Sequence, residues 1–345
     1  MTSEVQSIMS STTPVKAASH SRALLSVVVP AYNEAAVLPA FYRRLTSILD
    51  SLDVDAEIVF IDDGSGDETL GVLQGFRLTD GRIAIVSLSR NFGKEIALTA
   101  GLDHARGDAV VVIDADLQDP PELIPQLVEE WRNGYDVVYA KRSVREGETL
   151  LKKITAHAFY RLMQGVGRVK IPQDTGDFRL LSRRAVDALA QLKERNRFMK
   201  GLFTWIGYRQ RAVAYRRDPR LAGKTKWNYW RLWNFAIDGI TSFTTAPLKM
   251  ATYIGISVSA VALLYAGFMV ARTLVFGNPV EGYTSLLVIM LFLGGVQLFF
   301  IGIIGEYLGR MFDETKNRPL YLVNVHEPSA VQRAEASPRK MLKAL

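Results

Sequence analysis

The stretch that decides the fold is GDAVVVIDADLQDPP, which runs from Gly107 to Pro121. Its apolar part, Val110–Ile113, is short, β-branched and uninterrupted by polar residues, which is typical of a strand buried on both faces. Aspartates follow at the carboxyl end of this strand, at Asp114, Asp116 and Asp119. Because open α/β sheets bind ligands at that edge, the stretch predicts a buried strand followed by acidic ligand-binding residues.

These carboxylates have two interpretations. Carboxylates at alternate positions past a strand can converge on one hard cation, and Asp116 with the neutral oxygen of Gln118 could hold Mg²⁺ or Mn²⁺. Such an ion would bridge the phosphates of a nucleotide. The other interpretation is a polar turn whose aspartates cap a helix that begins near Pro121. An isolated Asp-x-Asp pattern does not distinguish the metal site from the capping turn, so the distinction depends on the rest of the sequence.

The composition excludes some classes of protein and leaves others open. The chain has 345 residues, of which 48% are hydrophobic and 22% charged, and it contains no cysteine. It therefore has neither a disulfide framework nor a cysteine-based zinc site. A formal net charge of +7 fits nucleic acid, anionic lipid head groups or phosphorylated substrates as partners. Residues 1–22 are rich in Ser and Thr and have no long apolar core, which predicts a flexible tail and not a signal peptide.

Strand and helix patterns alternate along the first part of the chain. Apolar runs predict strands at 24–29, 57–61, 82–88, 110–113 and 135–140. Helical spacing of apolar residues predicts helices at 37–52, 95–105, 121–131, 151–163 and 183–192. Repeated strand–loop–helix units indicate an α/β fold with a mostly parallel sheet and helices on both faces.

Polar loops follow several of these strands. Tyr32–Glu34 follows the first strand, Asp62–Asp63 the second, and Asp114–Gln118 the fourth. Right-handed crossovers put the carboxyl ends of parallel strands at one edge, so we expect these loops to meet in one cleft. A later turn leads into a short strand that reaches Leu181, with Asp177 at the junction. No Gly-x-Gly-x-x-Gly or Walker pattern follows any strand, which argues against a dinucleotide oxidoreductase or a P-loop enzyme.

A basic and aromatic segment separates this region from the rest of the chain. Between Arg195 and Arg231 there are eleven Lys or Arg residues and a single acid, Asp218, with aromatic residues interleaved. This composition could bind single-stranded nucleic acid, sit at a membrane interface, or form a solvated basic face. The next residues favour the membrane interface, because the polar and apolar stripes of 229–243 are typical of an amphipathic helix lying in it.

Two long apolar segments follow. Residues 250–276 contain one charge, Arg272, and residues 285–305 contain none, so each exceeds the roughly 18 residues expected of a membrane span. The connection between them holds no Lys or Arg, whereas basic residues flank the other ends at Lys249, Arg310, Lys316 and Arg318. The positive-inside rule then places both termini and the α/β domain in the cytoplasm. A buried core hairpin is the alternative, and the length of the segments argues against it.

Five motifs together give the chain a family resemblance. They are VVPAYNE (28–34), DDGS (62–65), RNFGK (90–94), DADLQDPP (114–121) and TGDFR (175–179). In this order, ending in two apolar spans, the chain resembles the polyprenyl-phosphate glycosyltransferases of glycosyltransferase family 2, which are related to dolichol-phosphate mannose synthase. It is most similar to the bactoprenol glucosyltransferase branch. The resemblance runs from about Leu24 to Arg310.

The resemblance implies a GT-A fold and an inverting transfer of one sugar, with glucose from UDP-glucose expected, to undecaprenyl phosphate at the inner membrane. It implies a tail at 1–22, a cytoplasmic GT-A domain at 23–226, interfacial helices at 227–249, two transmembrane helices at 250–309 and a cytoplasmic tail at 310–345. GDP-mannose, UDP-N-acetylhexosamine and UDP-aminoarabinose derivatives stay open as donors. A homotetramer and a role in lipopolysaccharide or other envelope glycan modification are further expectations, and a nucleic-acid partner is not expected.

The resemblance also implies roles for individual residues. It assigns metal binding to Asp116 and Gln118, and catalysis to Asp177 and Asp114. The nucleotide-binding residues would be Pro30, Tyr32, Glu34, Asp63, Lys94 and Asp114. A phosphate nucleophile is already largely ionised near neutral pH, so Asp177 could orient a substrate and not act as a base.

For the lipid phosphate, the expected residues are Arg197, Arg217, Lys224 and Lys226. Residues 223–226, Gly-Lys-Thr-Lys, resemble the Gly-x-Ser-Lys loop of the family, with Thr in place of Ser. The absence of a Gln-x-x-Arg-Trp pattern fits transfer of a single sugar. The competing hypothesis is a membrane-tethered protein that binds a nucleotide sugar without catalysis.

Overall fold

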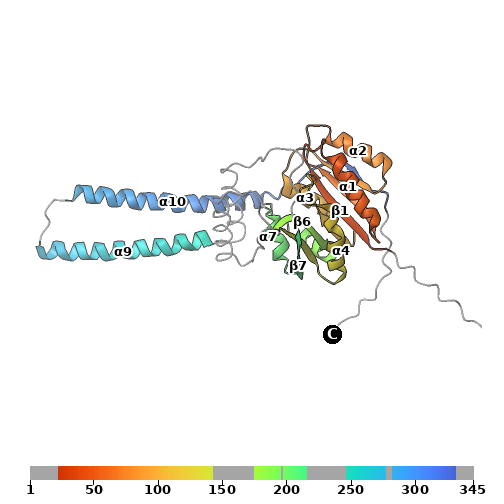
Figure 1. Ribbon diagram of the computed structural model, residues 1–345. Coiled ribbons are helices and arrows are strands. Elements are labelled where there is room, and N and C mark those ends of the chain that lie inside the picture. The colour runs from red at the N-terminus through yellow and green to blue at the C-terminus, as the bar shows by residue number, and fades with distance from the viewer. Residues whose placement is uncertain (1–21, 143–174, 196, 216–245, 277–281, 332–345) are drawn as a thin grey trace, which may run out of the picture.

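The computed structural model describes residues 22–142, 175–195, 197–215, 246–276 and 282–331. These residues form an α/β domain and a long hairpin of two helices that extends away from it (Figure 1). The helix predicted at 151–163 and the loop at 223–226 lie outside the described residues, as do residues 1–21 of the predicted tail.

The centre of the domain is an eight-stranded sheet in the order β7-β5-β6-β4-β1-β2-β3-β8. Its strands are β1 (Leu24–Ala31), β2 (Asp55–Asp62), β3 (Ile83–Leu88), β4 (Ala109–Val112), β5 (Val137–Arg142), β6 (Thr175–Ser182), β7 (Gln210–Tyr215) and β8 (Val323–Glu327). The pairs β1–β2, β1–β4, β2–β3 and β5–β7 are parallel, which confirms the predicted mostly parallel sheet. β6 and β8 run antiparallel to their neighbours.

Helices cover both faces of the sheet, as the alternating pattern predicted. On one face lie α1 (Leu38–Ser51), α2 (Thr69–Thr79) and α4 (Ile124–Arg132), which the short helix η1 (Pro121–Leu123) precedes. On the other lie α3 (Lys94–His104), α6 (Arg183–Ala190) and α7 (Met199–Trp205). In β1, Val27 packs into the first core and Val28 into the second, so alternate side chains fill both layers. This is why an unbroken apolar run predicted the strand correctly.

The structure differs from the expected place of Asp177. This residue lies inside β6, and not in a turn before a strand. β6 pairs antiparallel with β4, with Arg179 opposite Val112. The amino-terminal half of β6 therefore reaches the same edge of the sheet as the carboxyl end of β4, and it brings Asp177 there.

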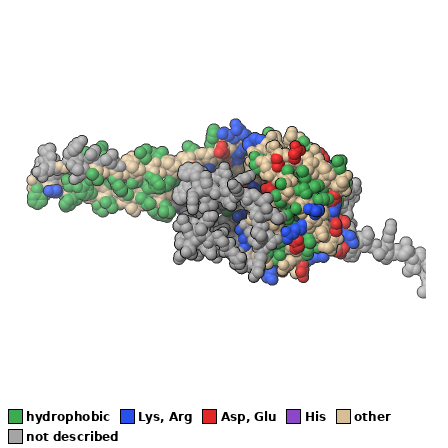
Figure 2. Space-filling view, turned by 45° about the horizontal axis from the view of Figure 1, so that its top comes forward, with side chains coloured by type: hydrophobic (Ala, Val, Ile, Leu, Met, Phe, Trp, Pro, Cys, Tyr) green, Lys and Arg blue, Asp and Glu red, His purple; other side chains and the backbone are tan. Residues whose placement is uncertain are grey.

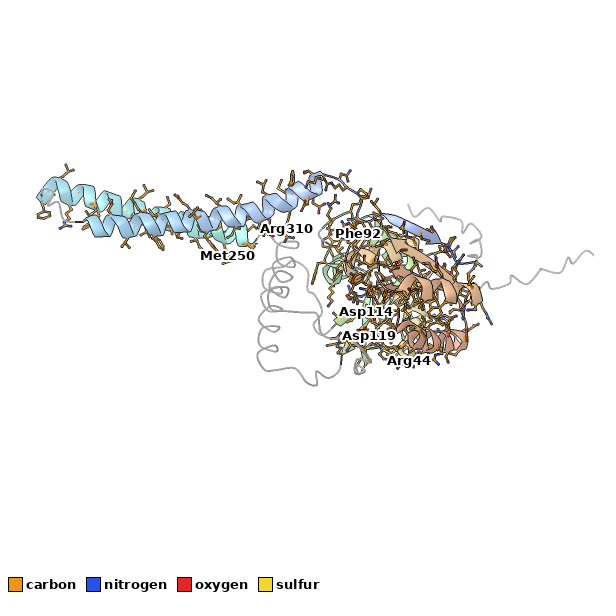
Figure 3. The ribbon with its side chains drawn as sticks, turned by 90° about the horizontal axis from the view of Figure 1, so that it is seen from above. Arg44, Phe92, Asp114, Asp119, Met250 and Arg310 are labelled. Atoms are coloured by element: carbon orange, nitrogen blue, oxygen red, sulfur yellow. The ribbon has the colours of Figure 1, made fainter. Side chains whose placement is uncertain are left out.

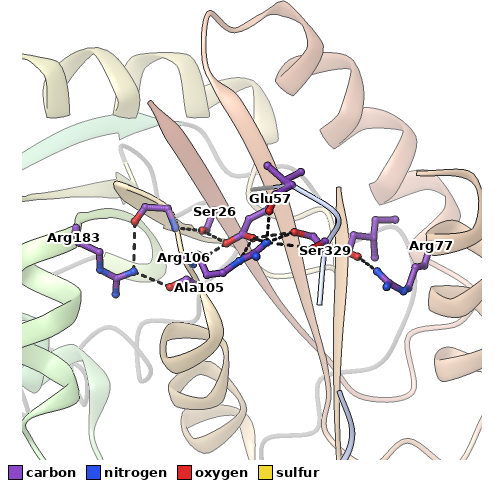
Figure 4. A network of polar contacts seen from close by, with 10 residues as sticks. Ser26, Glu57, Arg77, Ala105, Arg106, Arg183 and Ser329 are labelled. Atoms are coloured by element: carbon purple, nitrogen blue, oxygen red, sulfur yellow. Dashed lines mark hydrogen bonds and ion pairs between the residues drawn. The ribbon is translucent and has the colours of Figure 1, made fainter. Parts of the chain in front are cut away.

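The C-terminal segment corrects the prediction of a tail at 310–345. The second hairpin helix continues to Thr315, and β8 then adds to the free edge of β3. Beyond β8, Ser329 joins a buried network at the amino-terminal end of β2 (Figure 4). Glu57, whose side chain is 1% exposed, accepts hydrogen bonds from Ser26 Oγ at 2.6 Å and from Arg106 Nη2 at 2.7 Å, and from Ser329 Oγ at 3.1 Å. The chain thus returns from the hairpin to the domain and is bonded to its core.

The hairpin consists of α9 (Ala246–Phe276) and α10 (Tyr283–Thr315). Both helices are long and apolar enough to cross a membrane, and none of the described side chains in their apolar windows is buried. Hydrophobic side chains gather along the hairpin while Lys, Arg, Asp and Glu gather on the domain (Figure 2). Seen from above, Met250 and Arg310 mark the end of the hairpin nearest the domain (Figure 3). Of the predicted interfacial helices, residues 246–249 form the start of α9, and the others lie outside the described residues.

Candidate active site

The first two strand-end loops of the sheet are bonded to each other. Asn33, in the left-handed region at φ 55°, donates its backbone N–H to Ser65 Oγ at 3.0 Å. Its side-chain oxygen accepts the backbone N–H of Gly66 at 2.9 Å. The backbone N–H of Glu34 donates to Thr69 Oγ1 at 2.9 Å. The predicted meeting of these two loops is confirmed.

A third loop, between β3 and α3, closes on the second. Asp63 is 3% exposed, and its two carboxylate oxygens accept the backbone N–H groups of Phe92 at 2.7 Å and Gly93 at 2.9 Å. Gly64 has φ +66°, and a Cβ built on it would lie 2.4 Å from the carbonyl carbon of Arg90. Glycine is therefore required where these two loops cross. Asp63 fixes the loop from which Lys94 starts α3.

Lys94 joins the two acids at the centre of the site. Its Nζ lies 2.7 Å from Asp114 Oδ2, past the end of β4, and 2.7 Å from Asp177 Oδ2, in β6. The side chain of Asp177 is 12% exposed and that of Asp114 is 23% exposed, while that of Lys94 is 46% exposed. The expected catalytic acids are thus brought together by a lysine that the sequence had assigned to nucleotide binding.

Charge and burial give the two acids different protonation tendencies. Burial raises the pKa of Asp177, but the charges of Lys94 and Lys200 outweigh it and hold that pKa well below its usual range. Burial raises the pKa of Asp114, and the neighbouring Asp177 adds to the rise against the opposing charge of Lys94. Burial opposes the charge on Lys94, yet Asp114 and Asp177 together raise its pKa. The pair therefore keeps Asp177 ionised and Lys94 positive.

One carboxylate oxygen of Asp177 differs from the other in its bonding. Oδ1 is buried and accepts no hydrogen bond within the described residues. Nearby, Arg179 is 4% exposed, donates to the carbonyl of Gly176 at 2.7 Å and stacks over Phe203 at 3.8 Å. Burial lowers the pKa of Arg179 to about 10. Because a buried carboxylate oxygen without a donor is costly, the geometry leaves Asp177 able to accept a hydrogen bond from a bound molecule.

The aspartates after Asp114 divide into two kinds. Asp116 is half-buried, and its Oδ1 accepts the backbone N–H of Gln118 at 3.1 Å across Leu117, whose φ is 57°. Asp119 is 2% exposed and accepts a hydrogen bond from Tyr215, which ties it to β7. Asp119 therefore has a structural role, and Asp116 and Gln118 are placed at the tight turn.

The described residues contain no group of three or more His, Cys, Asp or Glu side chains arranged to hold a metal ion. This sparse set still fits Mg²⁺ or Mn²⁺, because such ions are often held by one or two protein oxygens together with substrate phosphates and water. A fully protein-lined cage is not needed in a site that binds a diphosphate. The expected metal ligands Asp116 and Gln118 supply one carboxylate and one amide oxygen at this turn.

Other expected binding residues lie at the end of β1 and after α6. Pro30 is half-buried at the end of β1, opposite Ile61, and Tyr32 is 38% exposed. Arg197 is half-buried and donates to the carbonyls of Leu189 and Leu192 at the end of α6. Its guanidinium is thus already engaged with backbone, and its expected lipid role stays a prediction. Arg217, Lys224 and Lys226 lie outside the described residues.

The sequence missed Glu95 and Lys200 at this site. Glu95 follows Lys94, and its Oε2 accepts the backbone N–H of Met199 at the start of α7, at 3.1 Å. Lys200 is the next residue of α7. α7 has only seven residues and was not predicted, so no pattern in the sequence placed Lys200 near the acids.

Comparison with known proteins agrees with this combination of fold and site. Residues 26–190 match glycosyl transferase family 2, and residues 246–311 match the GtrB C-terminal hairpin. An uncharacterized glycosyltransferase of Synechocystis is 55% identical over 87% of this chain and 94% of its own length. The bactoprenol glucosyl transferase of Shigella phage SfII is 50% identical over 87% of this chain and 97% of its own. The chain belongs to glycosyltransferase family 2, in the group that carries this hairpin, and it is an enzyme of the glycosyltransferase class.

Two solved structures show a limited similarity to this chain. Glucosyl-3-phosphoglycerate synthase from Mycobacterium tuberculosis, solved with Mn²⁺, UDP-glucose and phosphoglyceric acid, is 22% identical over 64% of this chain and 78% of its own, with a TM-score of 0.42. Mannosyl-3-phosphoglycerate synthase from Rubrobacter xylanophilus is 19% identical over 63% of this chain and 71% of its own, with a TM-score of 0.44.

Proposed function

We propose that this protein transfers one glucose, with inversion, from UDP-glucose to a polyprenyl phosphate at the cytoplasmic face of the inner membrane. The observation that carries the proposal is the Lys94 bridge between Asp114 and Asp177. Asp114 lies in the same loop after β4 as Asp116 and Gln118. Relatives that are 50% identical over nearly their whole length are named bactoprenol glucosyl transferases, which supports glucose and bactoprenol as the two substrates.

The donor would lie across the strand-end loops. Pro30, Tyr32, Glu34 and Asp63 are the proposed contacts to the uracil and ribose. The first two loops are held together by Asn33, and Asp63 fixes the third, so the nucleotide would meet a preformed surface. Lys94 and Asp114 would lie at the diphosphate and the sugar.

A divalent cation would be held by Asp116 and Gln118 together with the diphosphate. When bound, it would neutralise the negative charge that develops on the departing UDP. Lys94 supplies a second positive charge at the site, where it is bonded to Asp114 and Asp177.

The transfer itself needs little base catalysis. An oxygen of the acceptor phosphate forms a bond to the anomeric carbon of the glucose, and the bond from that carbon to the diphosphate breaks, so that UDP leaves with the electron pair. The second pKa of a phosphate monoester is about 6, so the nucleophile carries its negative charge already. A carboxylate held ionised by Lys94 is a weak base, which supports an orienting role for Asp177 through its unpartnered Oδ1.

The hairpin would place this site at the membrane. Its outward-facing apolar side chains suit lipid, as at Leu264, Phe268 and Leu274, which are 76%, 61% and 83% exposed. Lys249, Arg310, Lys316 and Arg318 lie toward its domain end, which favours a cytoplasmic domain under the positive-inside rule. A homotetramer is part of the same proposal.

A transfer assay with a panel of donors tests the proposal. The full chain in vesicles containing undecaprenyl phosphate is offered radiolabelled UDP-glucose, GDP-mannose, UDP-N-acetylhexosamine or a UDP-aminoarabinose derivative, with Mg²⁺ or Mn²⁺. We expect lipid-extractable label from UDP-glucose that EDTA and Asp116→Ala abolish. Label from another donor would correct the sugar. Binding of nucleotide sugar by folded protein without lipid-linked label from any donor would instead support the non-catalytic hypothesis.

A further inference from the structure

Lys200 lies on α7, a helix that contacts both α3, which begins at Lys94, and β6, which carries Asp177. It is the second residue of α7, and its ammonium makes no hydrogen bond or ion pair within the described residues. Burial raises the pKa of Asp177, and the charge of Lys200 is second only to that of Lys94 among the charges that lower it. The neighbours of Lys200 on α7 contact Glu95, which follows Lys94, and Arg179, which lies two residues after Asp177. Within the described residues its ammonium forms no ion pair, whereas that of Lys94 forms two.

The position of Lys200 is fixed by contacts of α7 on both sides. Glu95 Oε2 accepts the backbone N–H of Met199 at 3.1 Å, and Thr99 Oγ1 lies 3.8 Å from Met199 Sδ. Both partners belong to α3, which begins at Lys94. On the other side, Phe203 of α7 stacks under Arg179 of β6. α7 is thus held between the helix and the strand that carry the two bonded residues Lys94 and Asp177.

The same helix lies where the hairpin meets the domain. The backbone N–H of Arg195, shortly before α7, donates to Glu314 Oε1 near the end of α10 at 2.8 Å. Figure 1 shows α7 at the end of the domain nearest the hairpin. A head group that comes from the membrane would reach the site from this side.

The charges at the site define what Lys200 can do. An acceptor phosphate brings a charge of about −1.5 to −2 toward Asp177, which is itself negative. Lys94 is shared by two carboxylates, and Arg179 is buried and bonded to the carbonyl of Gly176. Arg142 is a further cation near Asp177; it bonds to Tyr215, and its buried Nε has no partner within the described residues. Lys200 differs from it in lying on α7, at the end of the domain nearest the hairpin (Figure 1).

We propose that Lys200 binds the phosphate of the lipid acceptor and holds its attacking oxygen beside Asp177. This inference rests on the proposed function and adds to it the residue that recognises the acceptor. A lysine suits this role because its ammonium offers three donors around a point charge. The assignment concerns the acceptor alone, since the proposed donor contacts lie on the loops that follow β1, β2, β3 and β4.

Steady-state kinetics of the full chain in detergent with undecaprenyl phosphate test this role. Lys200→Met should raise the KM for undecaprenyl phosphate roughly tenfold or more, because a charge-assisted hydrogen bond is lost. The KM for the nucleotide sugar should change less than about twofold, and Lys200→Arg should recover much of the acceptor affinity. Lys193→Met, an exposed lysine after α6, is the matched control and should leave both constants unchanged.

Binding gives a second measurement that does not depend on turnover. Undecaprenyl phosphate should protect the wild-type protein against thermal unfolding, and this protection should be lost in Lys200→Met while protection by UDP is kept. The assignment is overturned if Lys200→Met leaves the KM for undecaprenyl phosphate unchanged, or if it raises the KM for the nucleotide sugar instead. Failure of the wild-type protein to transfer sugar would overturn the proposed function instead, so the two failures are distinguishable.

Discussion

Lys94 Nζ lies 2.7 Å from Asp177 Oδ2 and at the same distance from Asp114 Oδ2, so one ammonium group holds together acids from β6 and from the loop after β4. Two carboxylates this close would repel each other without it. The arrangement positions both acids before any substrate arrives. It also makes Lys94 the residue on which the geometry of the site depends.

Replacing this lysine should therefore impair the chemical step. We expect Lys94→Met to lower kcat by about 100-fold or more, as for removal of a preorganised charge at an active site. The two acids would also lose their common partner, which raises the pKa of Asp177. The measurement is kcat and KM for glycosyl transfer, with Lys193→Met as the control. A kcat within about threefold of the wild-type value would show that the bridge is not needed for catalysis.

Glu95 should make the stability of the protein depend on pH. Burial, with the charge of Asp177, raises the pKa of Glu95 to about 7, above the value of about 4.3 expected in the unfolded chain. A carboxyl whose pKa is raised on folding favours the folded state below the unfolded pKa. This stabilisation is lost as the pH rises from about 4.3 through about 7.

The substitution Glu95→Gln tests this linkage, because the amide oxygen can still accept the N–H of Met199. We expect Glu95→Gln to unfold at a higher temperature than the wild type at about pH 8 and to lose this advantage near pH 5. Thermal unfolding scans in detergent at both values measure the difference. An advantage that does not change with pH would mean that Glu95 does not titrate in this range.

Transfer activity should depend on a divalent metal ion bound at the turn after β4. Removal of divalent ions by EDTA should abolish transfer, and Mg²⁺ or Mn²⁺ should restore it. Asp116→Asn should raise the metal concentration needed for half-maximal activity by roughly 10- to 100-fold, because a charged oxygen donor is lost. The control is Asp53→Asn, because the Asp53 side chain is 77% exposed. Activity that resists EDTA in metal-free buffer would contradict the assignment of Asp116 and Gln118.

The buried network at Glu57 should tie the C-terminal segment to the domain. Arg106 Nη2 lies 2.7 Å from Glu57 Oε2, and removing Glu57 leaves Arg106 and Ser329 without their common acceptor. We expect Glu57→Ala to destabilise the domain by about 3 kcal/mol, toward the lower end of the range for breaking a buried pair because Arg106 is 40% exposed.

Limited proteolysis measures the consequence directly. Cleavage after α10 should become faster in Glu57→Ala than in the wild type, because β8 and Ser329 lose part of their anchoring. Asp53→Asn, which removes the exposed Arg22–Asp53 pair, should change neither the proteolysis nor the unfolding temperature. Equal cleavage rates in all three proteins would mean that β8 is held by its pairing with β3 and by the Arg77–Glu327 ion pair, without help from the Glu57 network.

Part of this architecture could be predicted from the sequence because it depends on local patterns. β1 and β4 are unbroken β-branched runs buried on both faces, and they were located correctly. The long apolar helices were also evident, because length and absence of charge define them. The loops that meet at the edge followed from the parallel order of β1, β2 and β4.

The rest depends on contacts between distant parts of the chain. Nothing local indicates that β6 pairs antiparallel with β4, so the contact between Asp177 and Lys94 could not be derived. β8 is a five-residue segment that becomes a strand only because β3 offers a free edge. Asp119 belonged to the same acidic motif as Asp116, and only the position of Tyr215 shows that it is structural.

The most direct test of the central claim is the identity of the product made from UDP-glucose and undecaprenyl phosphate. The lipid extract from vesicles with the full chain is analysed by mass spectrometry for added hexose and by NMR for the configuration at the anomeric carbon. We predict undecaprenyl phosphate carrying a single glucose in the β configuration, since UDP-glucose is α-linked and the transfer inverts. Free glucose with UDP, or an α-linked product, would contradict the account.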